Sequence, residues 1–467
     1  MGFYVNQERR IVIIGGCAGG GTAAQFARKT DRKASITVFE KEKYPQYSKC
    51  GLPYVISGDI PSFTDLIEFS EEWFKKEHID LYLETIVERI DLHTHVVIAR
   101  KGNEQIEKPF DSLIIATGAQ PWIPPIKNLN NTERHIQGVH VLRTITDGEQ
   151  ISTQVKKGKK ATIIGAGLIG LEMADSLCKK GMKVTVVEAL PSILANTLDP
   201  DMCESVLTKL HDHLTLYTNH LATSIEDKNG SIASVTIINR ETNQELRLPT
   251  DLLVIATGCK PDVSLAKNIG CKIGVTGGIV VNEKSETSID HVYAVGDCTE
   301  YKEFITNQPV CIGLGSIVVR QGIAAGTNAA GGTCTLTSGV LLTRTSEFFG
   351  VEIAAVGPAQ QMLQNQPVIY GKYKGSSRPE YFPGGEPITI KIGVEEHTQR
   401  IISAQAVGSN AAQRMNVFAC AVLNKITVEE LKKLETTYAP PIAPTLDAIT
   451  LVCDVVSLKL SRKKTIL

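Results

Sequence analysis

Apolar residues in this chain gather in short continuous runs that end at glycine or glutamate. Residues 10–14 form one run and residues 35–39 form the next, with a helix-like stretch between them. This pattern predicts a β-turn-α-β unit with buried strands. Residues 161–164 and 183–187 repeat the same design farther along the chain. The pattern therefore predicts an α/β fold that contains this unit twice.

Each predicted unit has a glycine-rich turn after its first strand and a glutamate after its second. Such glycines let backbone N–H groups meet a pyrophosphate at a helix N-terminus, which predicts two Rossmann-like dinucleotide-binding domains. Glu40 and Glu188 can accept hydrogen bonds from ribose hydroxyls, and the carboxylate of Glu188 would repel a 2′-phosphate. The second unit is therefore expected to bind NADH, with NADPH disfavoured. Cys17 replaces the second glycine of the first turn, whereas Gly165 to Gly170 fits the fingerprint.

Three further strand-like runs end in small or polar residues that can face a cofactor. Residues 112–118 and 252–258 both end in Ala-Thr-Gly, and residues 292–298 contain Gly296-Asp297. An aspartate at a strand end can reach a polyol chain. The segment from Gly313 to Gly326 is predicted to begin a helix, whose N-terminus could stabilise negative charge on a reduced isoalloxazine ring.

Composition limits the classes of protein to which the chain can belong. Its 467 residues suggest about three domains, and its net charge of −1 favours neither nucleic acid nor an anionic membrane. Residues 1–6 lack an apolar signal stretch, and no run approaches about 18 apolar residues. The eleven cysteines form no metal-ligand cluster in the sequence. We expect a soluble cytoplasmic protein without a structural metal.

Cys50, in Tyr-Ser-Lys-Cys-Gly-Leu-Pro-Tyr, is the candidate redox thiol. Pro45 stands where a Cys-x4-Cys pair would place its first cysteine, and the next cysteine along the chain is Cys178. A single thiol must find its redox partner in a small thiol or an oxygen atom from outside. Gly51 and Pro53 let the backbone approach a flat cofactor closely. Cys50 would act as a thiolate, since that form is the nucleophile.

Over nearly its whole length the sequence resembles the pyridine nucleotide–disulfide oxidoreductases. The resemblance rests on the two glycine turns with their glutamates, both Ala-Thr-Gly strands and Gly296-Asp297. It implies FAD on the first unit and on Asp297, NAD(P)H on the second unit, and a C-terminal α+β dimerisation domain that forms a homodimer. It also places Cys50 against the flavin and Glu172 near the nicotinamide.

The same resemblance implies a set of cofactor-binding residues in each unit. For FAD they are Gly15, Gly16, Ala18, Gly19, Gly20, Glu40, Lys41, Val87, Ala116, Thr117, Gly118, Gly296, Asp297, Gly313 and Ser316. For NAD(P)H they are Gly165, Gly167, Ile169, Gly170, Glu172, Glu188 and Gly258.

Within this family the sequence is most similar to coenzyme A–disulfide reductases and NAD(P)H sulfur or polysulfide reductases. The paired-cysteine reductases are disfavoured, because this chain has no Cys-x4-Cys. Their His-Pro-Thr near the C-terminus is Ala443-Pro444-Thr445 here, so their proton shuttle is also missing. The single-cysteine NADH oxidases and peroxidases carry a histidine in the first glycine turn, where this chain has Ala18. The resemblance makes Tyr381 and Tyr438 candidates to protonate a leaving thiolate across the dimer.

Arg28 and Ser48 are candidate substrate contacts, and the resemblance implies that Arg28 meets coenzyme A phosphates, as arginines of the family do. Gln46 replaces the serine that the family has four residues before the active cysteine, so contacts near the thiol can differ. The expected reaction is reduction of a coenzyme A disulfide, a persulfide or a polysulfide. Two alternatives remain: an NADH oxidase or peroxidase that cycles through a Cys50 sulfenic acid, and a flavoprotein that passes electrons to a protein partner or senses NADH.

Motif order predicts the domain boundaries. The FAD-binding domain takes residues 7–125 and 265–335, the NAD(P)H-binding domain takes 126–264, and the dimerisation domain takes 340–467. In the last domain, alternating apolar residues predict antiparallel strands at 387–392 and 401–407, and helices are predicted at 414–424 and 427–434. Thr427 and Glu430 form a capping-box pattern.

Overall fold

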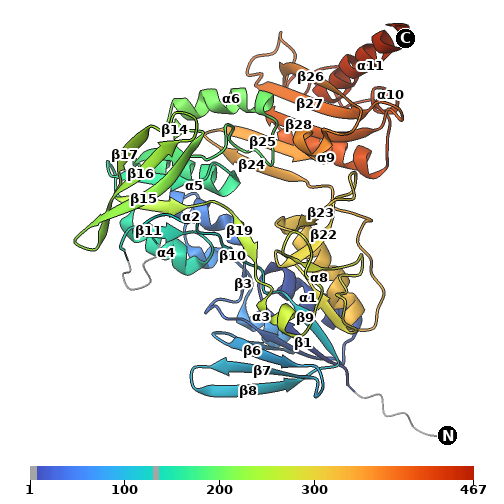
Figure 1. The fold of residues 1–467 in the computed structure, drawn as a ribbon. Coiled ribbons are helices and arrows are strands. Elements are labelled where there is room, and N and C mark those ends of the chain that lie inside the picture. The colour runs from blue at the N-terminus through green and yellow to red at the C-terminus, as the bar shows by residue number, and fades with distance from the viewer. Residues whose placement is uncertain (1–7, 130–135, 467) are drawn as a thin grey trace, which may run out of the picture. The chain divides into compact units, whose positions relative to one another are not determined.

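The computed structural model describes residues 8–129 and 136–466 (Figure 1). The chain divides into two compact units that each combine distant parts of the sequence. The first unit contains residues 8–122, 143–145 and 259–340, and the second contains 123–142, 146–258 and 341–466. The expectation of no signal stretch in residues 1–6, and the predicted domain start at residue 7, lie outside the described residues.

A five-stranded parallel sheet in the order β21-β9-β1-β2-β5 forms the centre of the first unit. Its strands are β1 (Arg10–Ile14), β2 (Ser35–Phe39), β5 (Ile79–Tyr82), β9 (Ser112–Ile115) and β21 (Val292–Ala294). All four residues of β9 are buried, as expected for a strand covered on both faces. The predicted buried strands of the first unit are therefore confirmed.

Two long helices of the first unit pack closely through small residues. α1 (Ala18–Thr30) lies against α8 (Gly315–Ala329), and a Cβ on Gly326 would lie 2.2 Å from the carbonyl oxygen of Ala23. Glycine at this position lets the two backbones touch. Buried alanines of both helices join the strands in one hydrophobic core.

Smaller elements complete the first unit. The strands are β3 (Gln46–Tyr47) with β4 (Ile67–Phe69); β6 (Ile86–Asp91), β7 (Val96–Lys101) and β8 (Glu104–Pro109); β10 (Ala119–Pro121) with β19 (Cys259–Pro261); and β20 (Ile279–Val280), β22 (Thr299–Lys302) and β23 (Pro309–Cys311). The helices are α2 (Leu52–Ser57), α3 (Glu71–Lys76) and α7 (Ser264–Asn268), with 3-10 turns η1 (Lys49–Gly51) and η2 (Phe63–Leu66).

The second unit repeats the parallel sheet, in the order β11-β18-β12-β13-β14. Its strands are β11 (Val139–Val141), β12 (Lys160–Ile164), β13 (Lys183–Val187), β14 (Thr215–Tyr217) and β18 (Leu252–Ile255). The accompanying elements are α4 (Ile145–Gln154), α5 (Leu168–Lys179) and α6 (Pro200–His211), and the antiparallel sheet of β15 (His220–Lys228), β16 (Ser231–Asn239) and β17 (Glu245–Pro249). The predicted second β-turn-α-β unit is therefore confirmed.

An antiparallel sheet in the order β24-β25-β28-β27-β26 ends the second unit. Its elements are β24 (Arg344–Phe348), β25 (Val351–Val356), η3 (Gln360–Leu363), β26 (Val368–Ser376), β27 (Pro387–Glu395), β28 (Ile401–Gly408), α9 (Ala411–Leu423), α10 (Val428–Leu431) and α11 (Ala448–Ile466). The predicted antiparallel strands are confirmed, since Ile388 pairs with Gly408 and Ile390 with Ala406.

The helix predicted at 414–424 forms as α9, but it begins earlier, at Ala411, and ends at Leu423. The helix predicted at 427–434 begins where expected. Both bonds of the capping box form, between Thr427 and Glu430. The helix that they begin ends at Leu431, so the predicted end at residue 434 is wrong. Leu434 donates its N–H to the carbonyl of Leu431 in a tighter turn that closes the helix.

Within residues 8–129 and 136–466, no helix combines the length and the apolar character needed to cross a membrane. The same residues contain no cluster of histidine, cysteine or carboxylate side chains suited to a metal ion.

Candidate active site

The first glycine turn is closed by backbone contacts that leave no room for side chains. Gly15 has φ +102°, and a Cβ there would lie 2.2 Å from the carbonyl oxygen of Ala116. A Cβ on Gly20 would lie 1.8 Å from the carbonyl oxygen of Gly15. Alanine would fit at neither position, so both glycines are needed to bring β1, β9 and α1 together.

Glu40 fastens this turn to the end of β2. Its Oε2 accepts the N–H of Gly16 at 2.7 Å, and its Oε1 accepts the N–H of Glu42 at 2.9 Å. Burial raises the pKa of Glu40, while these two hydrogen bonds oppose the shift. Each carboxylate oxygen keeps one lone pair for a ribose hydroxyl.

The second unit builds the same turn. Gly165 has φ +106°, and its Cβ would lie 2.4 Å from the carbonyl oxygen of Ala256. Glu188 accepts the N–H of Ala166 at 2.7 Å and that of Leu190 at 2.8 Å. A Cβ on Gly167 would meet nothing within 4 Å, so the fold itself does not require glycine there. The open space at Gly167 fits the close approach of a pyrophosphate.

Cys17 departs from the fingerprint without changing the backbone. Its φ and ψ are −71° and −160°, close to the −79° and −173° of Gly167 in the second turn. A side chain is tolerated because φ is negative. The thiol of Cys17 donates to the carbonyl oxygen of Tyr47 at 3.4 Å, and burial raises its pKa. The fold thus brings a second thiol beside the segment that leads to Cys50.

Cys50 lies in η1 and is exposed. The turn is held by the N–H of Ser48, which donates to the carbonyl of Leu66 at 2.8 Å, and a Cβ on Gly51 would lie 2.2 Å from the Leu66 side chain. Gly51 therefore lets η1 pack closely on η2. Ser48, the expected substrate contact, precedes η1 by one residue and is half-buried.

A polar cluster beside Cys50 was missed by the sequence analysis. The hydroxyl of Tyr47 donates to Glu42 at 2.6 Å, and the ammonium group of Lys49 donates to the other carboxylate oxygen at 2.6 Å. Burial, with Glu42 beside it, raises the pKa of Tyr47, so its hydroxyl stays protonated. The cluster fixes the chain just before Cys50. Its only sequence signal is that Glu42, Tyr47 and Lys49 are close together in the chain.

Asp297, the expected polyol ligand, is held by a residue that no motif indicated. Arg143 donates to its carboxylate at 2.7 Å, with both side chains about one quarter exposed. The preceding Gly296 has φ +85°, and its N–H donates to Gln321 at 2.8 Å. Arg143 is far from Asp297 in sequence, so only the fold reveals the pair.

The remaining expected FAD contacts lie on or next to strands and helices of the first unit. Gly118 has φ +70° and ends the Ala-Thr-Gly segment, whose Thr117 hydroxyl donates to the carbonyl of Asp262 at 2.6 Å. Gly313 and Ser316 are exposed around the start of α8, and a Cβ on Gly313 would meet nothing within 4 Å. Lys41 is exposed after β2, and Val87 is buried on β6. The open N-terminus of α8 fits a cofactor that gains negative charge.

The expected nicotinamide site contains Ile169 and Glu172 on α5. Ile169 is 42% exposed in the first turn of the helix. Glu172 is half-buried, and its carboxylate accepts a hydrogen bond from the hydroxyl of Ser346 at 2.6 Å. Burial raises the pKa of Glu172, and the bond from Ser346 opposes that shift. Gly258, with φ +106°, follows β18 and has open space beside it.

Tyr381 and Tyr438 are brought together by the C-terminal region. Their hydroxyl oxygens lie 2.8 Å apart, and the side chains are 71% and 48% exposed. The hydrogen bond to Tyr438 raises the pKa of Tyr381. Two linked phenols that face solvent can pass a proton to a molecule or subunit that covers them.

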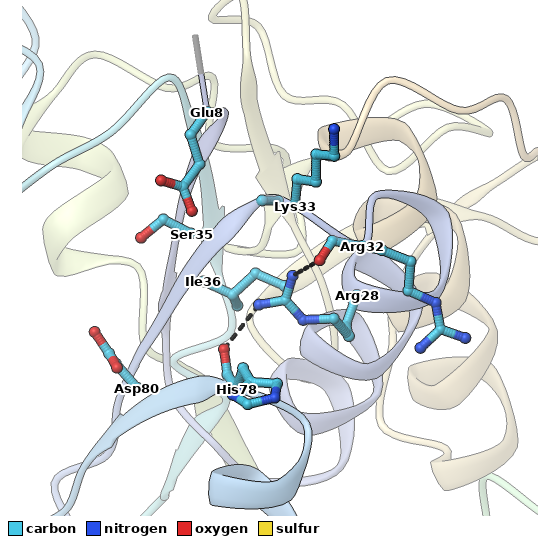
Figure 2. A pocket seen from close by; sticks show the side chains of 9 residues that line it. Glu8, Arg28, Arg32, Lys33, Ser35, Ile36, His78 and Asp80 are labelled. Atoms are coloured by element: carbon cyan, nitrogen blue, oxygen red, sulfur yellow. Dashed lines mark hydrogen bonds between the residues drawn. The ribbon is translucent and has the colours of Figure 1, made fainter. Parts of the chain in front are cut away.

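Arg28, the expected phosphate contact, makes four hydrogen bonds within the protein. Its guanidinium donates to the carbonyl oxygens of Glu77, Asp31, Arg32 and His78, at 2.9, 3.3, 3.0 and 2.7 Å. Figure 2 shows the bonds to Arg32 and His78. The side chain is buried and ties the end of α1 to the turn after α3. Four carbonyl acceptors occupy nearly all of its N–H donors, because an arginine has five.

Gln46 is buried on β3, where the family has serine. An ideal Cβ on Gly21 would lie 1.7 Å from its Oε1, so the bare glycine of α1 is what admits the longer side chain. Gln46 therefore fills the space beside the turn that leads to Cys50. This packing supports the expectation that contacts near the thiol are particular to this chain.

Comparison with known proteins gives consistent matches. The profile of pyridine nucleotide-disulphide oxidoreductases matches residues 9–330, and that of their dimerisation domain matches residues 344–448. An NADH oxidase of Methanocaldococcus jannaschii is 37% identical over 97% of this chain and 100% of its own length. A CoA-dependent NAD(P)H sulfur oxidoreductase of Pyrococcus furiosus is 33% identical over 96% of this chain and 99% of its own length. A solved NAD-dependent persulfide reductase from A. fulgidus has a TM-score of 0.91 and 32% identity, covering 97% of this chain and 84% of its own.

Proposed function

Since the chain belongs to the pyridine nucleotide-disulphide oxidoreductase family, and is thus an FAD-dependent enzyme with NADH as electron donor, we propose that it reduces a disulfide or persulfide of coenzyme A through Cys50. The observation that carries the proposal is the exposed thiol of Cys50, on a turn fixed by Leu66 and by the Glu42 cluster. No cysteine lies between Cys17 and Cys50 or between Cys50 and Cys178 in the sequence. In the proposed reaction the substrate supplies the second sulfur.

The sulfur chemistry balances around Cys50. Its thiolate attacks one sulfur of the disulfide, forms a mixed disulfide and releases one thiolate. Bound FAD would supply the two electrons, taken as hydride from NADH, that cleave this mixed disulfide. Cleavage returns the Cys50 thiolate and releases the second thiol. One NADH, one disulfide and one proton give NAD⁺ and two thiols. With a persulfide, the products are one thiol and hydrogen sulfide.

The residues of the two units have separate tasks in this scheme. Glu40 and the turn at Gly15 hold the adenosine half of FAD, and Asp297, oriented by Arg143, binds its polyol. The turn at Gly165 and Glu188 hold NADH. The lone pairs left on both glutamates and the open space at Gly167 are the structural features that fit these two nucleotides.

The Tyr381–Tyr438 pair is proposed to act in a homodimer. Both hydroxyls face solvent, and the region around them exposes apolar side chains such as Ile442 and Leu446, which are 73% and 58% exposed. Exposed apolar groups of this size are typical of an interface. Across that interface the phenol pair would protonate the leaving thiolate at the Cys50 of the other subunit.

An NADH oxidase is the second candidate, favoured by the similarity to the NADH oxidase of Methanocaldococcus jannaschii. Such an enzyme would cycle Cys50 through a sulfenic acid. Ala18 argues against efficient oxygen chemistry, because no imidazole is available at that position of the turn. Slow turnover with hydrogen peroxide or oxygen is therefore expected.

The deciding experiment is the intact mass of freshly purified protein, without and with reductant, followed by a peptide map around Cys50. A reductant-labile adduct of the mass of coenzyme A on Cys50 supports the proposed reaction. A single added oxygen on Cys50 supports the oxidase instead. Turnover of NADH with coenzyme A disulfide, compared with turnover with oxygen, then ranks the two acceptors.

A further inference from the structure

The C-terminal domain contributes a side chain to the NADH-binding part of the second unit. Ser346 of β24 donates its hydroxyl hydrogen to Oε1 of Glu172 on α5, at 2.6 Å. The two residues are 174 positions apart in the chain. A hydroxyl that donates to a carboxylate forms a short and strong hydrogen bond. The bond therefore constrains where the Glu172 carboxylate can lie.

The position of Ser346 is itself well determined. Ser346 is 8% exposed, and its backbone pairs with Ile353 of β25 within the antiparallel sheet. Its neighbour Thr345 is exposed, and the Thr345 hydroxyl donates to the carbonyl of Ile353. Neighbouring residues on a strand point to opposite faces. Ser346 is thus the member of this pair that faces α5.

Glu172 depends on this single donor among the residues that the structure describes. Burial alone makes its charged form unfavourable, and Ser346 is the group that counteracts this effect. Without the hydroxyl, the carboxylate would take up a proton more readily or turn toward water. Either change would alter the charge or the position of the Glu172 carboxylate.

A second connection joins the C-terminal domain to the start of α6. Lys391 of β27 pairs with Asp199 and Asp201 at 2.8 and 2.7 Å, and Gln405 of β28 accepts the N–H of Asp199 at 2.9 Å. Asp199 and Asp201 lie at the start of α6, after the segment that begins at Glu188. The C-terminal domain is thereby a fixed support from which Ser346 acts.

We propose that Ser346 is a positioning residue, which holds Glu172 in place for the nicotinamide half of NADH. The proposal rests on the proposed function in two respects, the placement of NADH on the second unit and the placement of Glu172 beside its nicotinamide half. The proposed function assigns the adenosine half to Glu188, whose carboxylate accepts the N–H of Ala166 in the glycine turn. Loss of the Ser346 hydroxyl should therefore weaken contacts to the nicotinamide half and leave those to the adenosine half unchanged.

The test compares two ligands on the holoenzyme by titration calorimetry. One is a non-reducing tetrahydro analogue of NADH, and the other is ADP-ribose, which lacks the nicotinamide. Ser346→Ala should weaken binding of the analogue by about tenfold, the effect of losing one hydrogen bond to a charged group. It should leave ADP-ribose binding unchanged. Ser346→Thr keeps a hydroxyl and should restore binding of the analogue.

Two further variants keep the result interpretable. Thr345→Ala removes a hydroxyl from the other face of the same strand and should bind both ligands like the unaltered enzyme. Glu172→Ala should reproduce the loss seen with Ser346→Ala, and the double variant should be no worse than either single one, because both remove the same interaction. If Ser346→Ala proves too unstable to purify, Glu172→Ala and Ser346→Thr still test the predicted selectivity.

The proposal is overturned if Ser346→Ala weakens ADP-ribose as much as the analogue, which would show general damage to the unit. It is also overturned if the analogue binds Ser346→Ala normally. Neither measurement involves a disulfide or Cys50. If the proposed disulfide substrate is wrong, the binding results for Ser346→Ala are unaffected. If the role proposed for Ser346 is wrong, the Cys50 chemistry is unaffected.

Discussion

Glu40 and Glu188 make the same pair of hydrogen bonds in two different units. Each accepts the N–H of the residue that follows the first glycine of its turn, and each accepts the N–H of the residue two places after itself. The two glutamates thus tie a glycine turn to the end of the neighbouring strand in the same way. Glu40 lies in the unit proposed to bind FAD, and Glu188 lies in the unit proposed to bind NADH.

Separate effects are expected when the two glutamates are changed in turn. Glu188→Ala should raise the KM for NADH by about tenfold, because it removes ribose contacts and loosens the turn. It should also reduce the preference for NADH over NADPH, since the charge that repels a 2′-phosphate is gone. Glu40→Ala should instead lower the flavin content. Flavin absorbance and kcat/KM for both nucleotides check these outcomes, and an unchanged nucleotide preference in Glu188→Ala would contradict the assignment.

Two glycines of the second turn should respond differently to alanine. Gly165→Ala forces φ +106° on a residue with a side chain, against the carbonyl of Ala256, so it should lower the Tm and abolish NADH binding. Gly167→Ala meets no protein atom and should keep the Tm. Its Cβ would occupy space meant for the pyrophosphate, and NADH affinity should fall by about tenfold or more. Thermal unfolding and NADH titration together check the pair. Normal NADH binding by Gly167→Ala would place the pyrophosphate elsewhere.

Cys50→Ser should abolish turnover of NADH with coenzyme A disulfide while flavin reduction by NADH continues. Cys17→Ser is the critical control, because the Cys17 thiol lies beside the Tyr47 backbone and burial raises its pKa. It should retain most turnover, as should Cys311→Ser at an exposed site. Stopped-flow flavin reduction and steady-state assays measure the two halves of the reaction. Loss of turnover in Cys17→Ser would point to an internal Cys17–Cys50 disulfide instead.

The hydrogen bond between Tyr381 and Tyr438 predicts a shift in the alkaline limb of the pH profile. The bond raises the pKa of Tyr381, so the phenol stays protonated to higher pH than an ordinary tyrosine. Tyr438→Phe removes the bond and should move the alkaline loss of disulfide reduction to lower pH. Tyr381→Phe and the double variant should lose similar activity, because the hydroxyls act as one unit. If the two single variants lose activity additively and the pH profile of disulfide reduction does not shift, the two hydroxyls do not share a proton.

Lys391→Met should destabilise the second unit by about 3–5 kcal/mol, because it leaves the buried Asp199 without its cation. Lys372→Met is the matched control: Lys372 also pairs with Asp201 but is more exposed, so about 1 kcal/mol or less is expected. Denaturant unfolding monitored at the C-terminal domain measures both. Equal losses of unfolding free energy in the two variants would contradict the larger role given to Lys391.

The same network gives a stability that depends on pH. Burial would raise the pKa of Asp201, but the two lysines outweigh burial and lower it. This contribution is present above the pKa of an aspartate in the unfolded chain and is lost as the pH falls through the lowered value. Lys391→Met should weaken that acid-side dependence.

Local patterns in the sequence determined the two nucleotide-binding units. The apolar runs, the glycines at 15 and 165 and the glutamates at 40 and 188 all act within one β-turn-α-β unit. Their roles follow from strand burial, positive φ and helix N-termini, which depend on neighbours in the chain. The capping box at Thr427 and the antiparallel strands of the C-terminal region could be predicted for the same reason.

Only the tertiary structure decided which distant side chains meet. Arg143 and Asp297 are 154 positions apart, Ser346 and Glu172 are 174 apart, and Tyr381 and Tyr438 are 57 apart. Nothing local distinguishes a serine that faces a helix from one that faces water. Arg28 gives another example, because only the fold reveals its four carbonyl partners. A hydrogen bond between remote residues depends on how whole elements pack, and that packing is not expressed in any short stretch of sequence.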